Sequence, residues 1–334
     1  MTLQPYSPSV SRYESGMNYR RCGRSGILLP EISLGLWQNF GADRPYSLSR
    51  EIILHAFDRG VVSFDLANNY GIPYGSAEET FGRVMNDSLH PFRDELFIAT
   101  KAGYDMWPGP YGNWGSRKYL TASLNQSLRR MNIDYVDLFY SHRYDPSTPL
   151  EETLQALVDI VKQGKALYVG ISRWPLEAMK YAVSYLAERD TPCLVFQDKL
   201  NILDRAPIES GLTEWLVSEG CGFTSFSPLA QGLLTSRYLN GVPADSRAAS
   251  GRHLKASQVT PALVEKLVAL DKVAGERGET LAQMALAWVL NTPGVTSVIV
   301  GCSSMEQFDD SLGAVSSAPF TASQLERIDA IARG

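Results

Sequence analysis

Short apolar runs recur along the chain and alternate with longer segments whose apolar residues are spaced as on one face of a helix. The runs that are rich in β-branched and aromatic residues predict eight strands, at 32–37, 61–67, 95–102, 135–142, 166–172, 194–201, 221–229 and 296–303. The helical spacing predicts helices at 49–60, 76–85, 121–131, 149–164 and 175–189. Strands that alternate with helices favour a parallel sheet covered by helices.

This α/β pattern fits a closed (β/α)8 TIM barrel, because eight strand–helix units fill a chain of 334 residues. An open, doubly wound sheet is the alternative, but no G-x-G-x-x-G motif follows the first predicted strand. The alternation breaks once, where roughly 65 residues separate the seventh and eighth strands, far more than one crossover needs. We expect a long loop rich in Gly, Ser and Arg at 230–258 and two helices within 261–291, one of them an addition to the barrel.

Composition and charge narrow the classes of function. The formal net charge is −5 and no run of lysines and arginines occurs, so a nucleic-acid partner is not expected. The four cysteines lack CxxC spacing, which indicates a reducing compartment and no metal site. No apolar stretch is as long as a membrane span, and the N-terminus lacks the apolar region of a secretory signal. We therefore expect a cytoplasmic protein without a membrane partner, with a tail at 1–17 and a single barrel domain at 18–334.

Polar or amphipathic residues fall late on successive predicted strands. They are Trp37, Asp65, Lys101, His142, Ser172, Gln197, Ser227 and Ser303. Because barrel enzymes place their active sites at the carboxyl ends of the strands, these residues should surround one mouth. Tyr70 follows Asp65 by five positions, just before Gly71, and should lie at the same edge.

An acid, a lysine, an imidazole and a phenol at one mouth suit the reduction of a carbonyl group. A buried lysine at 101 needs a counter-charge, which Asp65 can supply. The charge of Lys101 should lower the pKa of Tyr70 from its usual value of about 10 toward the working pH and make the phenol a general acid. His142 can donate a hydrogen bond to the carbonyl oxygen. None of these groups supplies a hydride, so the chemistry requires a cofactor.

Each of these four residues also has a structural alternative when it is taken singly. Asp65 could be satisfied by backbone N–H groups, Lys101 could be an ordinary strand-end lysine, and His142 could be a neutral core histidine. Tyr70 could simply pack beside a turn glycine. Their joint placement at one barrel mouth favours the catalytic interpretation.

The motifs around these residues resemble those of the aldo-keto reductase family, from about residue 18 to 330. FDLANNYG (64–71) resembles the Asp-and-Tyr signature of the family, IATKAG (98–103) its catalytic-lysine strand and LFYSHR (138–143) its catalytic-histidine strand. The resemblance implies that Tyr70 is the proton donor, that Lys101 and Asp65 tune its pKa, and that His142 orients the substrate. It also implies that NADPH lies extended across the mouth and transfers its hydride there.

The resemblance also implies a set of cofactor-binding positions. They are Trp37, Asp65, Ser172, Arg173, Gln197, Phe226, Ser227, Pro228, Leu229, Gly232, Arg237, Arg247, Gly301, Ser303, Gln307 and Asp310. Gln307 departs from the family, because many members have an arginine near this position that grips the 2′-phosphate of NADPH. In the branch that includes potassium-channel β subunits these cations come from the long loop, where Arg237 and Arg247 match them. Arg173 also matches that branch, and NADPH stays the favoured cofactor.

Three longer strings are similar to those of bacterial aldo-keto reductases that act on L-glyceraldehyde 3-phosphate and methylglyoxal. They are NNYGIPYGSAEETFG (68–82), TKAGYDMWPGPYG (100–112) and SRKYL (116–120). The similarity implies a small aldehyde substrate and a homo-oligomer, a tetramer or an octamer. The implied substrate pocket consists of Trp37, Tyr70, Trp107, His142 and Arg143, and the candidates for binding a substrate phosphate are Arg117, Lys118 and Arg143.

Two other classes of function stay open on the sequence. A lyase could use Lys101 as a Schiff-base nucleophile, although a charged Lys101 beside Asp65 argues against it. A sensor or partner subunit, as in the channel β branch, could hold NADPH without turning it over. The complete set of four catalytic residues favours turnover.

Overall fold

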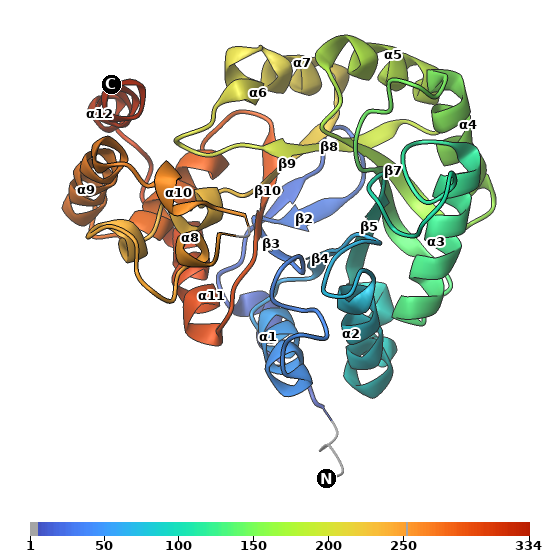
Figure 1. Cartoon of the computed structure of the whole chain (residues 1–334), viewed down its shortest axis with the longest axis horizontal. Helices are drawn as coiled ribbons and strands as arrows, with labels where there is room; N and C mark the ends of the chain where they lie inside the picture. Colours follow the sequence, from blue (N-terminus) through green and yellow to red (C-terminus); the bar gives the residue numbers. More distant parts are fainter. Residues whose placement is uncertain (1–5, 252) are drawn as a thin grey trace.

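The computed structural model describes residues 6–251 and 253–334, and it forms a closed barrel of eight parallel strands inside a ring of helices (Figure 1). The strands are, in barrel order, β10 (Val295–Val300), β3 (Ile32–Gly35), β4 (Ser63–Asp65), β5 (Phe97–Ala102), β6 (Val136–Ser141), β7 (Ala166–Ser172), β8 (Cys193–Lys199) and β9 (Gly222–Phe226). Each overlaps one predicted strand. The prediction of an α/β barrel is confirmed, and the open sheet is excluded because β10 pairs with both β3 and β9.

The connections after the strands carry the helices of the ring. These are α1 (Tyr46–Asp58), α2 (Ser76–Val84), α3 (Arg117–Met131), α4 (Leu150–Lys162), α5 (Leu176–Ala187), α6 (Ala206–Glu209), α7 (Leu212–Glu219), α10 (Leu281–Leu290) and α11 (Met305–Leu312). A π-helical turn, η2 (Met85–Leu89), and a 3-10 helix, η3 (His90–Glu95), extend α2. The sequence analysis did not predict α6, α7 or α11.

The break between the last two strands has the predicted form. In its described residues, the loop at 230–258 contains only short helical pieces, η4 (Ala230–Gly232), η5 (Ser236–Tyr238), α8 (Arg247–Ser250) and η6 (Ala256–Gln258). Two helices then follow, α9 (Pro261–Glu276) and α10, as expected. The added helix is α9, which packs with the C-terminal α12 (Ala322–Arg333) outside the ring, at the left of Figure 1. A last 3-10 turn, η7 (Gly313–Ser316), connects α11 with α12.

An antiparallel hairpin that the sequence did not predict lies at the amino-terminal end of the barrel. It consists of β1 (Tyr19–Arg21) and β2 (Leu28–Pro30). The backbone N–H of Arg24 in its turn donates to Gly220 O at 2.9 Å, and Cys22 Sγ donates to Leu194 O at 3.5 Å. Because Gly220 and Leu194 lie near the starts of β9 and β8, the hairpin forms a floor opposite the mouth.

The segment from Tyr6 to Met17 packs against the outside of the barrel. The Tyr6 hydroxyl and the Ser9 N–H both donate to Asp58 Oδ1 at the end of α1, at 2.8 and 2.7 Å. Arg12, in the 3-10 helix η1 (Arg12–Glu14), forms an ion pair with Glu95 at 2.7 Å. The part of the predicted 1–17 tail that precedes Tyr6 lies outside the described residues.

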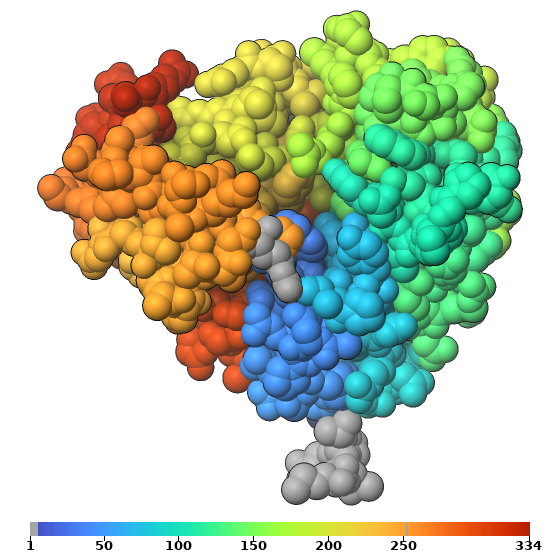
Figure 2. Space-filling view, viewed as in Figure 1, coloured from blue at the N-terminus to red at the C-terminus, as the bar shows by residue number. Residues whose placement is uncertain are grey.

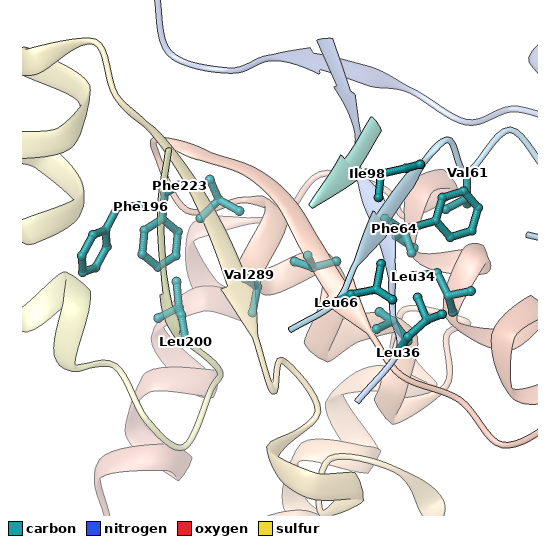
Figure 3. Close-up of a cluster of buried hydrophobic side chains, with 14 of the residues drawn as sticks. Leu34, Leu36, Val61, Phe64, Leu66, Ile98, Phe196, Leu200, Phe223 and Val289 are labelled. Carbon is teal, nitrogen blue, oxygen red and sulfur yellow. The ribbon is translucent and has the colours of Figure 1, made fainter. Parts of the chain in front are cut away.

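The main apolar core lies between the strands and the surrounding helices (Figure 3). Phe64 on β4 and Ile98 on β5 are fully buried neighbours in it, and the Phe196 and Phe223 rings lie 6.4 Å apart on β8 and β9. All four cysteines are buried free thiols. Among the described residues, no helix is long and apolar enough to cross a membrane, and no group of His, Cys, Asp and Glu is arranged to hold a metal ion. This core fixes the strand ends that carry the polar residues described next.

Candidate active site

A buried ion pair lies at the centre of the mouth. Lys101 on β5 is fully buried, and its Nζ lies 2.5 Å from Asp65 Oδ2 at the end of β4. The same ammonium donates to Leu66 O at 2.7 Å. Gln197 Nε2 on β8 donates to the other Asp65 oxygen, Oδ1, at 2.9 Å. Both carboxylate oxygens are therefore satisfied, which a buried charge requires.

The segment after β4 brings Tyr70 over this pair. The N–H groups of Leu66 and Asn68 donate to Ala99 O and Lys101 O, both at 2.9 Å, so the chain continues alongside β5. It then turns back, with Tyr70 N donating to Ala67 O at 3.0 Å. As a result the Lys101 ammonium donates to the Tyr70 hydroxyl at 3.3 Å. The segment FDLANNYG therefore supplies two residues, Asp65 and Tyr70, that both bond to the Lys101 ammonium.

His142 completes the cluster. It follows β6, where its N–H donates to Ala102 O at 2.9 Å, and its side chain is buried. Its ring meets the Tyr70 ring edge to face, with centroids 5.9 Å apart. Its Nδ1 is buried and has no hydrogen-bond partner among the described residues. The structure thus brings the four predicted catalytic residues together.

Aromatic side chains line the mouth around this cluster. Trp37, just after β3, lies over Tyr70 with ring centroids 6.2 Å apart. Tyr104, three residues after Lys101, meets the His142 ring at a centroid distance of 4.7 Å. The predicted pocket residues Trp37, Tyr70 and His142 therefore lie side by side, and Tyr104 is an addition to this group.

The predicted cofactor residues on β7 to β9 follow one another along the mouth. Ser172 is buried at the end of β7, in register with Gln197 on β8. The Arg173 guanidinium lies 5.9 Å from the centre of the Phe226 ring at the end of β9. Arg173 has a φ of 57° and Ser227 a φ of 50°. Left-handed conformations at residues other than glycine are uncommon and concentrate at functional sites.

The turn after β9 continues this unusual backbone. Ser227, Ala230, Gln231 and Gly232 all have positive φ, at 50°, 47°, 61° and 94°. Pro228 is buried and Leu229 half-buried between them. The N–H groups of Ala230 and Gly232 are used inside the turn, where they donate to Ser227 O and Leu229 O, both at 2.9 Å. This turn contains four of the predicted cofactor-binding positions, Ser227, Pro228, Leu229 and Gly232.

Three arginines gather beside the turn. Arg247 is half-buried, and its Nη1 donates to Gln231 Oε1 at 3.3 Å. Burial lowers the pKa of Arg247, and the neighbouring cations Arg237 and Arg44 lower it further. Arg237 has an acidic partner, Asp245, at 2.8 Å. Among the described residues Arg247 has no carboxylate partner, so the cluster carries excess positive charge.

The predicted cofactor-binding positions after β10 use their polar atoms within the protein. Gln307 Oε1 accepts from the Ser303 N–H at 3.1 Å and from its hydroxyl at 2.9 Å. The Asp310 carboxylate accepts from Thr280 Oγ1 at 3.1 Å and from Gln283 Nε2 at 3.0 Å, so it supports the start of α10. Gly301 is exposed directly after β10.

The loop between β5 and α3 is held in place by Arg143. Its Nε donates to Gly103 O at 2.7 Å and its Nη2 to Asn113 Oδ1 at 2.6 Å. Its guanidinium also stacks on Tyr104 and Trp114, with centroid distances of 4.4 and 3.6 Å. Its Nε and Nη2 groups therefore both bond to the loop, so Arg143 supports this loop structurally.

Of the other residues proposed for the substrate, Trp107 lies in this loop, and Arg117 and Lys118 begin α3. Trp107 packs on Tyr119 at a centroid distance of 5.2 Å and lines a separate pocket of about 530 Å³. Arg117 pairs with Asp159 at 2.5 Å, and the Lys118 ammonium lies 5.0 Å from the centre of the Tyr111 ring. The structure therefore occupies Arg117 and Lys118 with other partners and brings neither into contact with the catalytic cluster.

The long loop meets the β3–α1 loop across the mouth. His253 stacks on Trp37 at a centroid distance of 4.7 Å, and Gln38 Nε2 donates to Gln231 Oε1 at 3.3 Å. Figure 2 shows the orange long loop beside the blue β3–α1 loop near the centre of this face. One of these contacts involves the turn with positive φ, because Gln231 belongs to it.

Comparison with known proteins agrees with this geometry. The model of the Aldo/keto reductase family matches residues 31–333. The chain belongs to the aldo-keto reductase family. It is 50% identical to L-glyceraldehyde 3-phosphate reductase of Escherichia coli K12 over 317 residues, which are 94% of this chain and 92% of the relative. It is 34% identical to a probable voltage-gated potassium channel subunit beta of rice, Oryza sativa subsp. japonica, over 94% of this chain and 96% of the relative. As an aldo-keto reductase it is an oxidoreductase that uses a nicotinamide cofactor.

Burial dominates the ionisation of this aldo-keto reductase site. It raises the pKa of Tyr70 well above the usual value, and the charge of Asp65 raises it further. The expectation that Lys101 lowers the Tyr70 pKa is therefore corrected, because the loss of water around the phenol outweighs the lysine charge. Burial also lowers the pKa of Lys101, although Asp65 opposes this. Burial and the charges of Lys101, Arg173 and Arg143 hold the pKa of His142 well below its usual range, so its imidazole is neutral at neutral pH.

Two residues of this aldo-keto reductase site were absent from the sequence analysis. Arg44 lies in the β3–α1 loop and joins the arginine cluster, and Tyr104 joins the wall of the pocket. No local pattern marks either residue, because both depend on where a loop folds. The only available signal for Tyr104 was its place three residues after Lys101, on the side of the mouth.

Proposed function

We propose that this aldo-keto reductase reduces small aldehydes to alcohols with NADPH, with L-glyceraldehyde 3-phosphate and methylglyoxal as substrates. One observation carries the proposal: the Tyr70 hydroxyl accepts from a buried Lys101 that is paired with Asp65, and it lies beside the neutral imidazole of His142. The 50% identity with a protein named for the reduction of L-glyceraldehyde 3-phosphate supports this substrate.

In this mechanism the cofactor, when bound, supplies a hydride to the carbonyl carbon of the aldehyde. Tyr70 gives its hydroxyl proton to the carbonyl oxygen, so that the alcohol leaves and a phenolate remains. The Lys101 ammonium, already bonded to that phenol oxygen, stabilises the negative charge as it develops. The His142 imidazole, whose ring lies beside the Tyr70 ring, orients the carbonyl oxygen beforehand. Asp65 and Gln197 keep Lys101 fixed throughout.

The residues along the mouth fit a dinucleotide phosphate. Arg247 is half-buried without a carboxylate partner among the described residues, Arg237 and Arg44 are close to it, and Arg247 bonds to Gln231 of the turn at 227–232. Such a concentration of cations stabilises a phosphate dianion by charge-assisted hydrogen bonds. We therefore propose that this arginine cluster binds the 2′-phosphate and pyrophosphate of NADPH and that Ser172, Arg173 and Phe226 hold its nicotinamide end.

A substrate panel tests the function. We expect the protein to oxidise NADPH when methylglyoxal or glyceraldehyde 3-phosphate is added, with one alcohol formed per cofactor consumed. The measurement is the loss of absorbance at the reduced nicotinamide band, with product analysis by chromatography. Tight binding of NADPH without oxidation by any aldehyde of the panel would contradict the proposal and favour a sensor.

The cofactor preference is tested at Arg247. In Arg247→Ala we expect KM for NADPH to rise about 10- to 100-fold, because a charge-assisted contact worth about 1.5–3 kcal/mol is lost. KM for NADH, which lacks the 2′-phosphate, should rise much less. Arg237→Ala is the comparison variant, because Asp245 already pairs with it at 2.8 Å and its loss should cost less. An equal rise of KM for NADPH and NADH would show that Arg247 does not bind the 2′-phosphate.

The alternative function, a sensor, is supported by the 34% identity to a potassium channel β subunit. The aldehyde panel described above distinguishes a sensor from a reductase. The lyase alternative has less support, because the Lys101 ammonium already donates to Asp65, Leu66 O and Tyr70. Borohydride trapping of a carbonyl substrate on Lys101 would reverse this judgement. We further propose a cytoplasmic homo-oligomer, a tetramer or an octamer, which size-exclusion chromatography with light scattering can test.

A further inference from the structure

Tyr104 presents a second phenol to the catalytic cluster. Its ring meets the His142 imidazole edge to face, with centroids 4.7 Å apart and planes at 85°. The same imidazole meets the Tyr70 ring at 5.9 Å and 70°. His142 is therefore in contact with two phenols, and Tyr104 is the nearer one by ring centroid.

The hydroxyl of Tyr104 is open to a ligand. In the described part of the chain it has no hydrogen-bond partner, and it is not among the polar atoms that are sealed from solvent. The phenol is also close enough to Tyr70 to contribute to the raised pKa of that residue. A free hydroxyl beside the proton donor can donate a hydrogen bond to a second atom of the substrate.

The protein holds Tyr104 rigidly from two directions. Its backbone carbonyl accepts from the Tyr119 hydroxyl, which in turn accepts from Asn68 Nδ2 at 2.9 Å. On the other side of this network, the Arg143 guanidinium stacks on the Tyr104 ring at 4.4 Å. Asn68 belongs to the catalytic segment, so the loop and the proton donor are positioned together. A side chain that is fixed in this way can discriminate between substrates by a single hydrogen bond.

We propose that Tyr104 is a specificity-determining residue whose hydroxyl donates a hydrogen bond to an oxygen on the carbon next to the reacting carbonyl. The carbonyl oxygen is bound between Tyr70 and His142, and the neighbouring carbon then lies toward the second phenol on the same imidazole. The residue therefore selects 2-hydroxy and 2-oxo aldehydes over unsubstituted aldehydes. This inference rests on the proposed function and specifies its substrate class, since glyceraldehyde 3-phosphate and methylglyoxal both carry such an oxygen.

The test compares 2-hydroxypropanal with propanal, which differ only in that oxygen. In Tyr104→Phe we expect kcat/KM for 2-hydroxypropanal to fall about 10-fold and kcat/KM for propanal to change less than about 2-fold. The ring and its contact with His142 are kept in this variant. Tyr111→Phe is the matched control, because Tyr111 lies in the same loop and is 55% exposed. It should leave both values unchanged.

Equal losses for the two aldehydes in Tyr104→Phe would overturn the proposal and show that the residue only supports His142. No loss for either aldehyde would overturn it as well. Binding of the two aldehydes, followed through quenching of tryptophan fluorescence near Trp37, gives the same selectivity ratio without turnover. Loss of that ratio in Tyr104→Phe supports the proposal even if the protein turned over neither aldehyde, which would contradict the proposed function alone.

Discussion

Replacing Tyr70 by phenylalanine is expected to lower kcat for aldehyde reduction by about 10³-fold, because the general acid of the reaction is removed while its ring stays in place. The affinity for NADPH should change less than about 3-fold, since the arginine cluster is untouched. Steady-state kinetics and a fluorescence titration of NADPH measure the two effects. Tyr74→Phe is the control, because Tyr74 is 57% exposed in the same connection and should be silent.

The pH profile of the unmodified protein checks the same assignment. The pKa of Tyr70 is raised well above its usual value and the pKa of His142 is lowered well below its own. The phenol therefore stays protonated and the imidazole stays neutral, so kcat/KM for the aldehyde should be flat between about pH 6.5 and 9. A loss of activity with an apparent pKa near 7 or 8 would mean that bound cofactor brings Tyr70 into the working range, contrary to this expectation.

Removing the charge of Lys101 is expected to affect stability as well as rate. Lys101→Met leaves Asp65 buried without its cation, and the free energy of unfolding should fall by about 3–5 kcal/mol. Turnover should also fall about 10³-fold or more, because the phenolate formed on Tyr70 loses its stabilising charge. Urea denaturation followed by circular dichroism measures the first effect, and steady-state kinetics measures the second.

The double variant Asp65→Asn/Lys101→Met separates these two consequences. It removes both charges, and the amide oxygen that replaces the carboxylate can still accept the hydrogen bond from Gln197 that Asp65 now receives at 2.9 Å. Most of the lost stability should return, whereas activity should stay low. The free energy of unfolding of Lys101→Met alone could instead lie within about 1 kcal/mol of that of the parent protein. The ion pair would then be structurally unimportant, and the argument for a costly buried charge would fail.

The barrel could be predicted from the sequence because its strands contain short apolar runs, as in LFIA (96–99) around β5, and their spacing allows only a few topologies. The floor hairpin could not, because its strands are three residues each and contain arginines and a proline. Its pairing depends on contacts with β8 and β9 rather than on local pattern. The helix α7 was missed for a related reason, since its eight residues follow a turn that carries no strong helix signal.

The catalytic four residues were predictable because each one ends or follows a strand, and a barrel brings such ends together. The direction of the Tyr70 pKa was not, because the sequence shows which charges are near but not how much water is lost. Tyr104 and Arg44 depend on the path of loops. Arg143 was expected to face the substrate, yet its contacts with Gly103 and Asn113 show a supporting role that only coordinates can reveal.

The floor hairpin must wait for its partners during protein synthesis. Cys22 and Arg24 bond to Leu194 and Ser218, which follow them by 172 and 194 positions. At synthesis rates of about 5–20 residues per second, the hairpin waits roughly 10–40 s for these partners to leave the ribosome. Residues near the start of the chain thus stay without these contacts until β8 and the segment before β9 have been made, during about half of the synthesis of the chain.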